Sequence, residues 1–517
     1  MNHFWYNDYG IERMMNRALY LVLGIKLLIL GWIATSGAIG LGPDEAQYWT
    51  WSQALDWGYY SKPPGIAWEI WIGTRTFGNT LFGVRVVALL LGTLLPLAVY
   101  WMARQCGFTN KTACWSGIVM ALTPLGMMGT LLTITDTGMV FFWTLACGML
   151  CRAWEKRKEP DYLLIGLLIG CGSLFKWPIF LLWSIIFGMM PYYAFLRSKK
   201  VIAGVLISLL GLLPSFTWNI QHGWVTFRHV FYNLHGSDLA KKSGFAIFQG
   251  NVWEFLGAQT ALLSPILFVL LAITLFAFVR QFNTFPSSAR LCGLITFFLL
   301  VGALFLSMFK KMQGNWIDYA YPTGITLLCW YACERKPKLL IWLKAGVALS
   351  LALCILLLSV PFNFIPIPFK MNPFKHNLGW EALSPALTSE GYDPDKDFLF
   401  SSTYQTASIL SFYGPKQERA YFLNLHGTRL NQFSFWPGME QKAGKNGYFV
   451  MVDNAPHLQK KIEGAEALKE ELEDYFEEVD YLGVKPLYIS EGTAVKAALI
   501  YRCIGYNGKI PPQPERY

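Results

Sequence analysis

The feature that most constrains this chain is a series of apolar stretches, each almost free of charge and about as long as a membrane-spanning helix. A helix of about 20 apolar residues crosses roughly 30 Å of hydrocarbon. Charged residues make up only 15% of the 517 residues, whereas a soluble domain carries about 25%. The sequence therefore predicts a polytopic α-helical membrane protein with about eleven spans, at residues 19–40, 83–103, 113–131, 137–153, 162–176, 178–196, 201–219, 258–279, 291–309, 317–333 and 339–361.

The formal net charge of +10 follows from membrane topology rather than from nucleic acid binding. If Met1 is cytoplasmic, Lys and Arg gather in short alternate connections, as in proteins that obey the positive-inside rule. The other side then receives three longer segments, residues 41–82, 220–257 and everything after 361. We expect membrane lipids, and no nucleic acid, as the partner of the basic loops. No cleavage site follows the first apolar run, so we expect it to be a retained helix.

Two regions differ in composition. Residues 1–361 form the predicted membrane region, and residues 362–517 are richer in charge, with short apolar runs typical of a soluble α/β domain. Strands are predicted at 397–402, 420–424, 447–453 and 498–506, and helices at 403–414 and 457–476. The Pro-rich segment 361–374 is the predicted linker, because proline disfavours continuation of the last membrane helix.

The ten cysteines give no sign of a disulfide framework or a metal site. Nine of them, from Cys106 to Cys354, fall in predicted spans or at their inner ends. Cys503 stands alone in the C-terminal domain, so that domain cannot form an internal disulfide. The spacing along the chain suggests no zinc or iron–sulfur site.

Paired carboxylates stand just beyond the first span, in the stretch GLGPDEAQYWTWSQ. An acid inside the bilayer is costly and usually functional, and Asp44 and Glu45 avoid most of that cost by lying one turn beyond the hydrocarbon. They are candidate catalytic residues, but PDEA is also a typical helix start, so helix capping is the other interpretation. Adjacent residues point to different faces of a helix, so at most one is expected to be the central group. The aromatic neighbours Tyr48 and Trp49 are candidates for a substrate cavity.

The same loop continues as WGYYSKPPG. Two prolines after Lys62 hold the backbone extended and fix where its ammonium group points. An interfacial lysine is often only a side chain that reaches for water. The rigid Pro-Pro and the flanking Tyr59 and Tyr60 favour a ligand role instead. A carboxylate and a fixed cation in one loop suit a substrate that bears both a hydroxyl and a phosphate.

Further isolated charges are expected at the same outer membrane surface. Asp136 is the only charge between two apolar spans, in a loop so short that it must lie level with Asp44. Asp is also common in plain turns. Lys176 stands alone at the outer end of the fifth predicted span. The segment FKKMQGNWIDYAYP adds Lys310, Lys311, Asn315 and Trp316 on the same side.

The outer loop 220–257 is rich in histidine, aromatic and basic residues. Trp224, Phe227 and Phe231 recur at helical spacing, which predicts an amphipathic helix on the membrane face. Its role is either interfacial anchoring or the lining of a substrate cavity, the latter with His222, Trp224 and Arg228. The histidines His222, His229 and His235 could bind metal, although no strict ligand spacing supports this.

The first outer loop resembles that of the membrane-embedded glycosyltransferases of the GT-C type, which use lipid-linked sugars. The carrying motifs are GPDEAQYWTWSQALDWGYYSKPPG, TITDTGMVFFW, SLFKWPIF, LPSFTWNIQHGWVTFRH and GNWIDYAYP. The likeness is greatest to the family of the lipid A aminoarabinose transferase and the related lipopolysaccharide-core transferases, and more distant to protein O-mannosyltransferases. It covers residues 20–335, and the region after 361 looks similar to the family's periplasmic domain.

The resemblance implies transfer of a sugar from a polyprenyl (undecaprenyl) phosphate donor to a lipid or glycan acceptor, such as lipid A or lipopolysaccharide core. It implies a bacterial inner-membrane protein with its active site and C-terminal domain on the periplasmic side. Asp44 matches the family's catalytic Asp, Lys62 the lysine on the carrier phosphate, Asp136 a cavity acid and Lys176 a cavity lysine. Some members bind a divalent metal ion near the first loop, but Ser61 stands here where an acidic ligand is found.

The residues also suggest a mechanism. A sugar phosphate is already activated, and its leaving anion needs a cation, for which Lys62, helped by Lys176 or by Lys310 and Lys311, is suited. Asp44 can take the proton of the acceptor hydroxyl, and a single displacement would invert the anomeric centre. The main alternative is a lipid or solute transporter, which predicts charges near mid-bilayer and two related halves. A scaffold protein would leave these isolated charges without a role.

Overall fold

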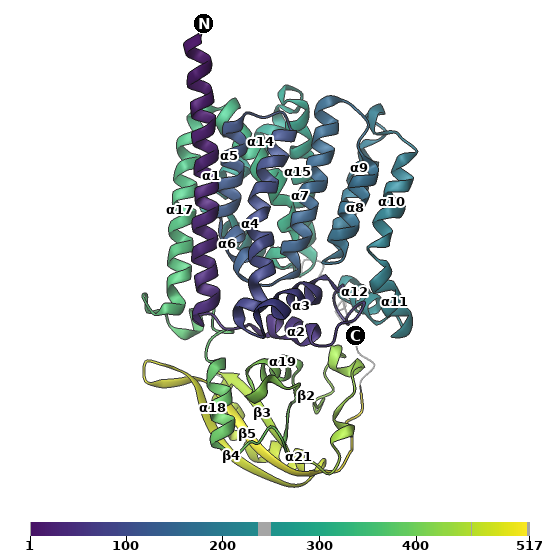
Figure 1. Cartoon of the computed structure of the whole chain (residues 1–517), viewed down its shortest axis with the longest axis vertical. Helices are drawn as coiled ribbons and strands as arrows, with labels where there is room; N and C mark the ends of the chain where they lie inside the picture. Colours follow the sequence, from purple (N-terminus) through teal and green to yellow (C-terminus); the bar gives the residue numbers. More distant parts are fainter. Residues whose placement is uncertain (1, 236–249, 456, 514–517) are drawn as a thin grey trace.

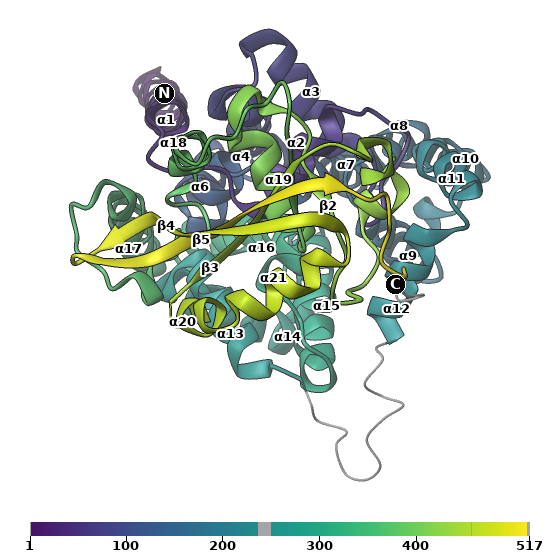
Figure 2. The same ribbon diagram turned by 90° about the horizontal axis from the view of Figure 1, so that it is seen from below.

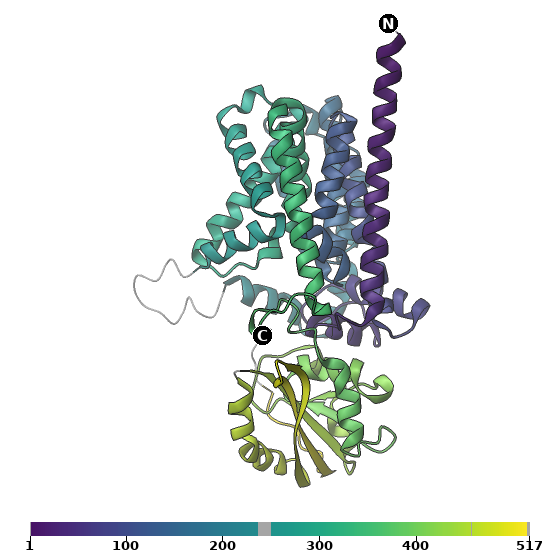
Figure 3. The same cartoon turned by 90° about the vertical axis from the view of Figure 1, so that its left-hand side faces the viewer.

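A computed structural model describes residues 2–235, 250–455 and 457–513. A bundle of long helices is stacked on a smaller domain that contains a sheet (Figure 1; Figure 3). The bundle helices are α1 (Asn2–Ser36), α4 (Leu81–Gln105), α5 (Asn110–Leu122), α6 (Pro124–Leu131), α7 (Thr135–Lys156), α8 (Tyr162–Ser173), α9 (Leu181–Met189), α10 (Lys200–Leu210), α13 (Val252–Leu263), α14 (Pro265–Arg280), α15 (Ser287–Phe309), α16 (Tyr321–Trp330) and α17 (Leu340–Ser359).

The helices confirm a polytopic membrane protein but not the predicted number of spans. Among the described residues, four helices are long and apolar enough to cross a membrane, or up to seven if each bent pair is one span. The bends are 59° between α5 and α6, 50° between α10 and α11 (Leu213–Gln221), and 107° between α13 and α14. Proline stands in the first turn of the second helix of each pair. Proline is tolerated there but cannot continue a preceding helix.

A layer of short helices separates the bundle from the sheet domain (Figure 1). It contains α2 (Pro43–Ser52), α3 (Gly65–Phe77), α11 and α12 (Val225–His235). Helix α3, which was not predicted from the sequence, buries Ile66, Ala67 and Ile70 on one face and packs against α4. The helix predicted in the loop 220–257 is confirmed by α12, whereas residues 236–249 lie outside the described part of the chain.

The sheet domain has five strands in the order β2-β1-β3-β5-β4. The strands are β1 (Phe398–Ser401), β2 (Tyr421–Phe422), β3 (Gly447–Asn454), β4 (Phe476–Ser490) and β5 (Thr493–Tyr506). Strand β1 pairs in parallel with β2 and β3, whereas β5 is antiparallel to β3 and β4. Four strands match the prediction, and β4 was missed.

Helices cover both faces of this sheet (Figure 2). On one face lie α18 (Leu383–Ser389) and α19 (Tyr404–Tyr413), and on the other α20 (His457–Glu463) and α21 (Ala465–Glu473). The helix predicted at 457–476 is therefore split at Gly464. One apolar core runs from Trp49 of α2 through Leu410 of α19 to Ile500 of β5. The sheet domain is thus fixed onto the layer that carries the acidic first loop.

Candidate active site

Helix α2 presents its two acidic residues in different surroundings. Gly42 is the N-cap, Pro43 follows it, and Asp44 and Glu45 lie in the first turn. Negative side chains are favourable there because the N-terminus of a helix carries a partial positive charge. Glu45 is buried and accepts the Gly42 N–H at 3.2 Å, which completes a capping box. Asp44 remains exposed.

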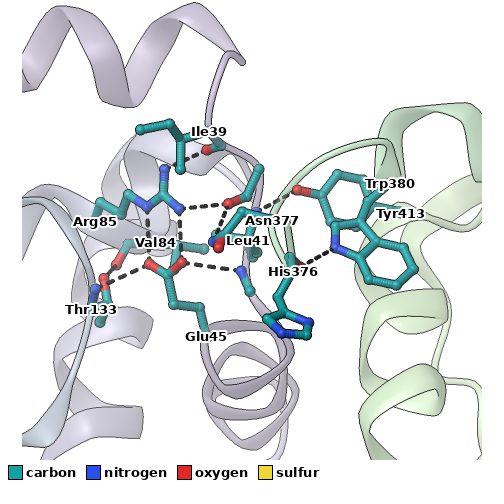
Figure 4. Close-up of polar contacts among 12 residues, drawn as sticks. Ile39, Leu41, Glu45, Val84, Arg85, Thr133, His376, Asn377, Trp380 and Tyr413 are labelled. Atoms are coloured by element: carbon teal, nitrogen blue, oxygen red, sulfur yellow. Dashed lines mark hydrogen bonds and ion pairs between the residues drawn. The ribbon is translucent and has the colours of Figure 1, made fainter. Parts of the chain in front are cut away.

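The carboxylate of Glu45 is fully engaged by neighbouring groups (Figure 4). Arg85 of α4 donates Nε–H to Oε1 at 3.0 Å and Nη2–H to Oε2 at 2.8 Å, and both side chains are buried. The backbone N–H of Thr133 also donates to Oε1 at 3.0 Å. A buried charge is tolerable only when it is paired in this way. These contacts fit the capping interpretation of Glu45 and leave Asp44 as the acid of α2 that is open to a substrate.

Neighbouring hydrogen bonds to the backbone of Gly40 and Leu41 join the bundle to the sheet domain (Figure 4). Arg85 Nη2 donates to the carbonyl oxygen of Gly40 at 2.9 Å, and Asn377 Nδ2 donates to the same oxygen at 2.9 Å. The N–H of Leu41 donates to the hydroxyl of Tyr413 at 2.6 Å. A Cβ atom at Gly40 would lie 2.5 Å from the carbonyl oxygen of Asn377, so this approach requires glycine. The loop that carries Asp44 is therefore held by both regions.

Lys62 is held by a turn that is tied to the end of α8. The N–H of Tyr59 donates to the Lys62 carbonyl oxygen at 3.2 Å, and the N–H of Gly65 donates to the Leu174 carbonyl oxygen at 2.7 Å. A Cβ at Gly65 would lie only 2.6 Å from that oxygen. Glycine after the two prolines thus lets the Lys62 loop approach the segment that carries Lys176.

Asp136 and Lys176 form a largely buried ion pair. Asp136 lies in the first turn of α7, and Lys176 precedes the short helix η1 (Trp177–Phe180). Lys176 Nζ lies 2.5 Å from Asp136 Oδ1. Asn315 Nδ2 donates to Asp136 Oδ2 at 3.4 Å. Asp136, Lys176 and Asn315 are far apart in the sequence but are in contact in the structure.

Asp318 is a further acid at this position that the sequence analysis did not single out. It lies in the short helix η4 (Gly314–Ala320), is buried, and interacts with both Asp136 and Lys176. Adjacent buried carboxylates repel each other unless a cation or a proton compensates, and Lys176 supplies one positive charge for the two acids. A signal was present in the sequence, because Asp318 is the only acidic residue between Glu254 and Glu334.

The charged loops converge on Lys62. Burial lowers the pKa of Lys62 below its ordinary value of 10.5; Lys176 lowers it further, and Asp136 and Asp44 raise it. Burial raises the pKa of Asp44 above its ordinary value of 3.8, and the charge of Lys62 opposes that rise. The Asp44 side chain is exposed, but the protein surrounds it closely enough to raise its pKa. Asp44, Asp136 and Lys176 thus all act electrostatically on Lys62.

The sheet domain adds a cation to this environment. Arg429 acts electrostatically on both Asp44 and Lys62, and its Nη1 lies 3.4 Å from Nε2 of the buried His229. Burial lowers the pKa of His229 to about 4, with Arg429 and Lys62 as further causes. His229 is therefore a neutral imidazole at pH 7. Arg429 was not among the site residues predicted from the sequence.

The predicted aromatic lining divides into two groups. Trp49 and Tyr59 are completely buried. Trp49 meets Phe412 of the sheet domain edge-on at 5.0 Å, and Tyr59 stacks on Trp51 at 4.6 Å, so both belong to the packing of the loop. Tyr48 and Tyr60 lie beside titratable groups instead. Burial raises the pKa of Tyr48, and the charges of Asp44 and Asp136 raise it further. The ring of Tyr60 lies 4.7 Å from that of His229.

The remaining candidates lie around this centre. The ring of His222 stacks on Trp218 at 4.0 Å, and Trp224 and Arg228 are exposed on or beside α12. Trp316 Nε1 donates to Gln313 Oε1 at 2.9 Å. Lys310 and Lys311 follow the end of α15, and within the described ranges neither forms an ion pair with Asp44 or Asp136. The side chain of His235 lies outside the described residues.

A divalent metal ion does not fit the residues near the first loop. The neighbours of His229 are the cations Arg429 and Lys62, which would repel a metal ion, and Ser61 replaces the acidic ligand that the resemblance implies. In the part of the chain described, the one group of three potential ligand atoms within 4.8 Å of one another is Cys106, Cys151 and Cys292. These thiols are buried at the ends of α4, α7 and α15 that lie farthest from the first outer loop. Buried cysteines commonly serve as small apolar side chains.

Comparison with known proteins finds similar sequences among glycosyltransferases. The family described as dolichyl-phosphate-mannose-protein mannosyltransferase matches residues 61–218. Lipid A galacturonosyltransferase RgtD of Rhizobium johnstonii is 28% identical over 343 residues, which is 65% of this chain and 68% of that protein. Undecaprenyl phosphate-alpha-4-amino-4-deoxy-L-arabinose arabinosyl transferase of Pseudomonas aeruginosa is 29% identical over 192 residues, which is 33% of this chain and only 35% of that protein.

Solved structures show the same fold. ArnT from Cupriavidus metallidurans in the apo state matches with a TM-score of 0.60 at 14% identity, over 94% of this chain and 98% of that chain. The structure of ArnT bound to undecaprenyl phosphate also matches with a TM-score of 0.60, at 12% identity, over 93% and 97% of the two chains. The chain is thus similar in sequence to glycosyltransferases and shares the fold of ArnT.

Proposed function

We propose that this glycosyltransferase moves a sugar from a polyprenyl phosphate donor to a hydroxyl or phosphate of a lipid A or lipopolysaccharide-type acceptor. The observation that carries the proposal is the shared environment of Asp44, Lys62, Asp136 and Lys176 at one end of the helices. The names of the relatives, a lipid A galacturonosyltransferase and an undecaprenyl phosphate-linked arabinosyl transferase, support the donor and acceptor classes.

Asp44 is the proposed general base. It is the acid of α2 that remains exposed, whereas Glu45 is closed by Arg85. A raised pKa strengthens a carboxylate as a proton acceptor, provided that it is still ionised at the working pH. Asp44 would accept the proton of the acceptor as its oxygen attacks the anomeric carbon. A single displacement of this kind inverts that carbon.

Lys62 is the proposed cation for the leaving phosphate. The bond between the sugar and the phosphate breaks with its electron pair on the phosphate oxygen, so negative charge grows there. A pre-positioned ammonium group stabilises that charge without reorganisation. The lowered pKa of Lys62 reflects burial and a neighbouring lysine, and a bound anion would relieve the repulsion between the two cations.

Asp136 and Lys176 are proposed to fix the electrostatics of the site rather than to exchange protons. Their ion pair is short and largely buried, and Asn315 and Asp318 surround it. Lys176 pairs with Asp136, and its charge also acts on Lys62. This arrangement keeps Lys62 beside negative charge without joining it to a carboxylate.

The location of the site follows from the proposed topology. We infer eleven spans within residues 1–361, with residues 362–517 as a periplasmic domain. Basic residues gather in the short connections of the opposite side, which supports this orientation. The carrier chain would then stay in the lipid while its phosphate meets the first outer loop.

Mass spectrometry of envelope glycolipids tests the function. Cells that lack the gene should lose a lipid A or core species that is heavier by one sugar, and the wild-type gene should restore it. The gene that encodes Asp44→Asn should not. Identical glycolipid spectra with and without the gene would contradict the proposal.

A further inference from the structure

A segment of the sheet domain is docked on the outer loops of the bundle, and it positions Arg429. Gln432 Oε1 accepts the backbone N–H of Tyr60 at 2.7 Å. The ring of Phe435 stacks on that of Tyr60 at 6.0 Å and meets Trp218 edge-on at 6.2 Å. Tyr60, Trp218 and Gln432 are all buried. The backbone on which Arg429 stands is therefore fixed against the loop that carries Lys62.

The guanidinium group of Arg429 is held by neutral partners. Nη2 donates to the hydroxyl of Tyr404 at 3.2 Å, and Nη1 lies 3.4 Å from Nε2 of His229. The guanidinium carbon lies 5.9 Å from the centre of the Tyr404 ring. In the described ranges no carboxylate lies within ion-pair distance of Arg429, which is itself exposed. These contacts orient the cation without neutralising it.

The charges around Arg429 favour an additional anion. Lys176 is committed to Asp136, and Arg85 to Glu45. Arg429 and Lys62 then remain as two cations that act on each other and on Asp44. Like charges brought together cost free energy that a bound anion would recover. Arginine also binds phosphate well, because its planar fork can donate two hydrogen bonds to two oxygens.

We propose that Arg429, oriented by Tyr404 and His229, binds a phosphate group of a substrate opposite Lys62, so that the sheet domain supplies part of the binding site. This inference rests on the proposed function. The phosphate belongs either to the lipid carrier or to the acceptor, and both sources offer the same chemistry. The sheet domain is then part of the substrate site and not only a cap on the bundle.

The test uses the purified full-length protein with Arg429→Ala and Arg429→Lys. Arg502→Ala is the matched control, because Arg502 is an exposed arginine on β5 of the same domain. Binding of undecaprenyl phosphate is measured directly, and the KM for donor and acceptor is measured in the transfer reaction. Loss of a charged hydrogen-bonding partner predicts a weakening of about tenfold to a hundredfold in Arg429→Ala, partial recovery in Arg429→Lys, and wild-type behaviour in the control.

The two sources of phosphate give different results. If Arg429 binds the carrier, Arg429→Ala weakens binding of undecaprenyl phosphate and raises the KM of the donor. If it binds the acceptor, binding of undecaprenyl phosphate is unchanged and the KM of the acceptor rises. Unchanged values for both, in a wild-type protein that transfers sugar, would overturn the role of Arg429 alone. A wild-type protein without transfer activity would overturn the proposed function and this inference with it.

Discussion

Asp44 and Glu45 are neighbours in the sequence, yet α2 places their carboxylates in two different kinds of surroundings. Glu45 faces the bundle, where its carboxylate oxygens accept hydrogen bonds from Arg85, Gly42 and Thr133. Asp44 faces the side on which Lys62 and Arg429 act. Loss of one partner of the closed pair would destabilise the fold, whereas we propose that the open acid, beside Lys62 and Arg429, exchanges a proton with a substrate. The partners of each acid, rather than its position in the sequence, therefore distinguish the structural role from the proposed chemical one.

The largest expected effect comes from neutralising the open acid. Asp44→Asn removes the proposed base and should lower the transfer rate by about a hundredfold to ten-thousandfold, as measured with purified protein and a lipid-linked donor. Its melting temperature should stay close to that of the wild type, because Asp44 forms no buried ion pair among the described residues. A transfer rate comparable to that of the wild type would remove Asp44 from the mechanism.

Neutralising the closed acid should act on stability instead. Glu45→Gln leaves the buried Arg85 without its counter-charge, and removal of one partner from a buried pair costs about 3–5 kcal/mol. Thermal unfolding in detergent should show a clearly lower melting temperature, while the molecules that remain folded keep most of their transfer activity. Wild-type stability together with abolished transfer would mean that the two acids have exchanged roles.

Removal of the fixed cation should have an intermediate effect. Lys62→Ala deletes the group that meets the leaving phosphate, and loss of one such electrostatic contact lowers the rate by about a hundredfold or more. The loss should appear mainly in kcat/KM for the donor. The control is Lys370→Ala, because Lys370 is an exposed lysine of the linker. Equal kinetics for the two variants would contradict the assignment of Lys62.

The smallest expected effect is a shift of the pH profile. The active form needs ionised Asp44, whose pKa is raised mainly by burial, so kcat/KM should fall with decreasing pH at a value above 3.8. Lys62 opposes that rise and Glu45 adds to it. Lys62→Ala should therefore move the acid limb to higher pH, and Glu45→Gln should move it to lower pH. Shifts in the same direction would contradict the proposed surroundings of Asp44.

Asp136 and Lys176 could be singled out from the sequence because each stands alone beside an apolar segment, whereas Asp44 and Lys62 were singled out by their place in the first outer loop and by the two prolines after Lys62. Asp136 and Lys176 have no charged neighbour for many residues on either side, and the short loops fix their depth in the membrane. Asp318 is the only acidic residue between Glu254 and Glu334 and was overlooked. The sequence around Arg429 does not indicate a role in the site, because charged residues are common in a soluble domain. Its place depends on a contact between Tyr60 and Gln432, which are 372 residues apart.

The fold was predicted least well where proline and glycine interrupt regular patterns. Three helix pairs are bent at a proline, so helix length alone does not give the number of spans. Strand β4 is an edge strand with register shifts near Gly483 and Pro486, so its sequence lacks the apolar alternation of a half-buried strand. Glycine at Gly40 and Gly65 allows close approaches that no local pattern reveals.

The most direct test of the account is an electron cryo-microscopy structure of the full-length protein with bound undecaprenyl phosphate. We predict phosphate density within hydrogen-bond distance of Lys62 Nζ, on the side of α2 that carries Asp44 and beside the Asp136–Lys176 pair. Phosphate bound elsewhere, for example at Lys310 and Lys311 with Lys62 directed away from it, would contradict the claim that these charges form one site.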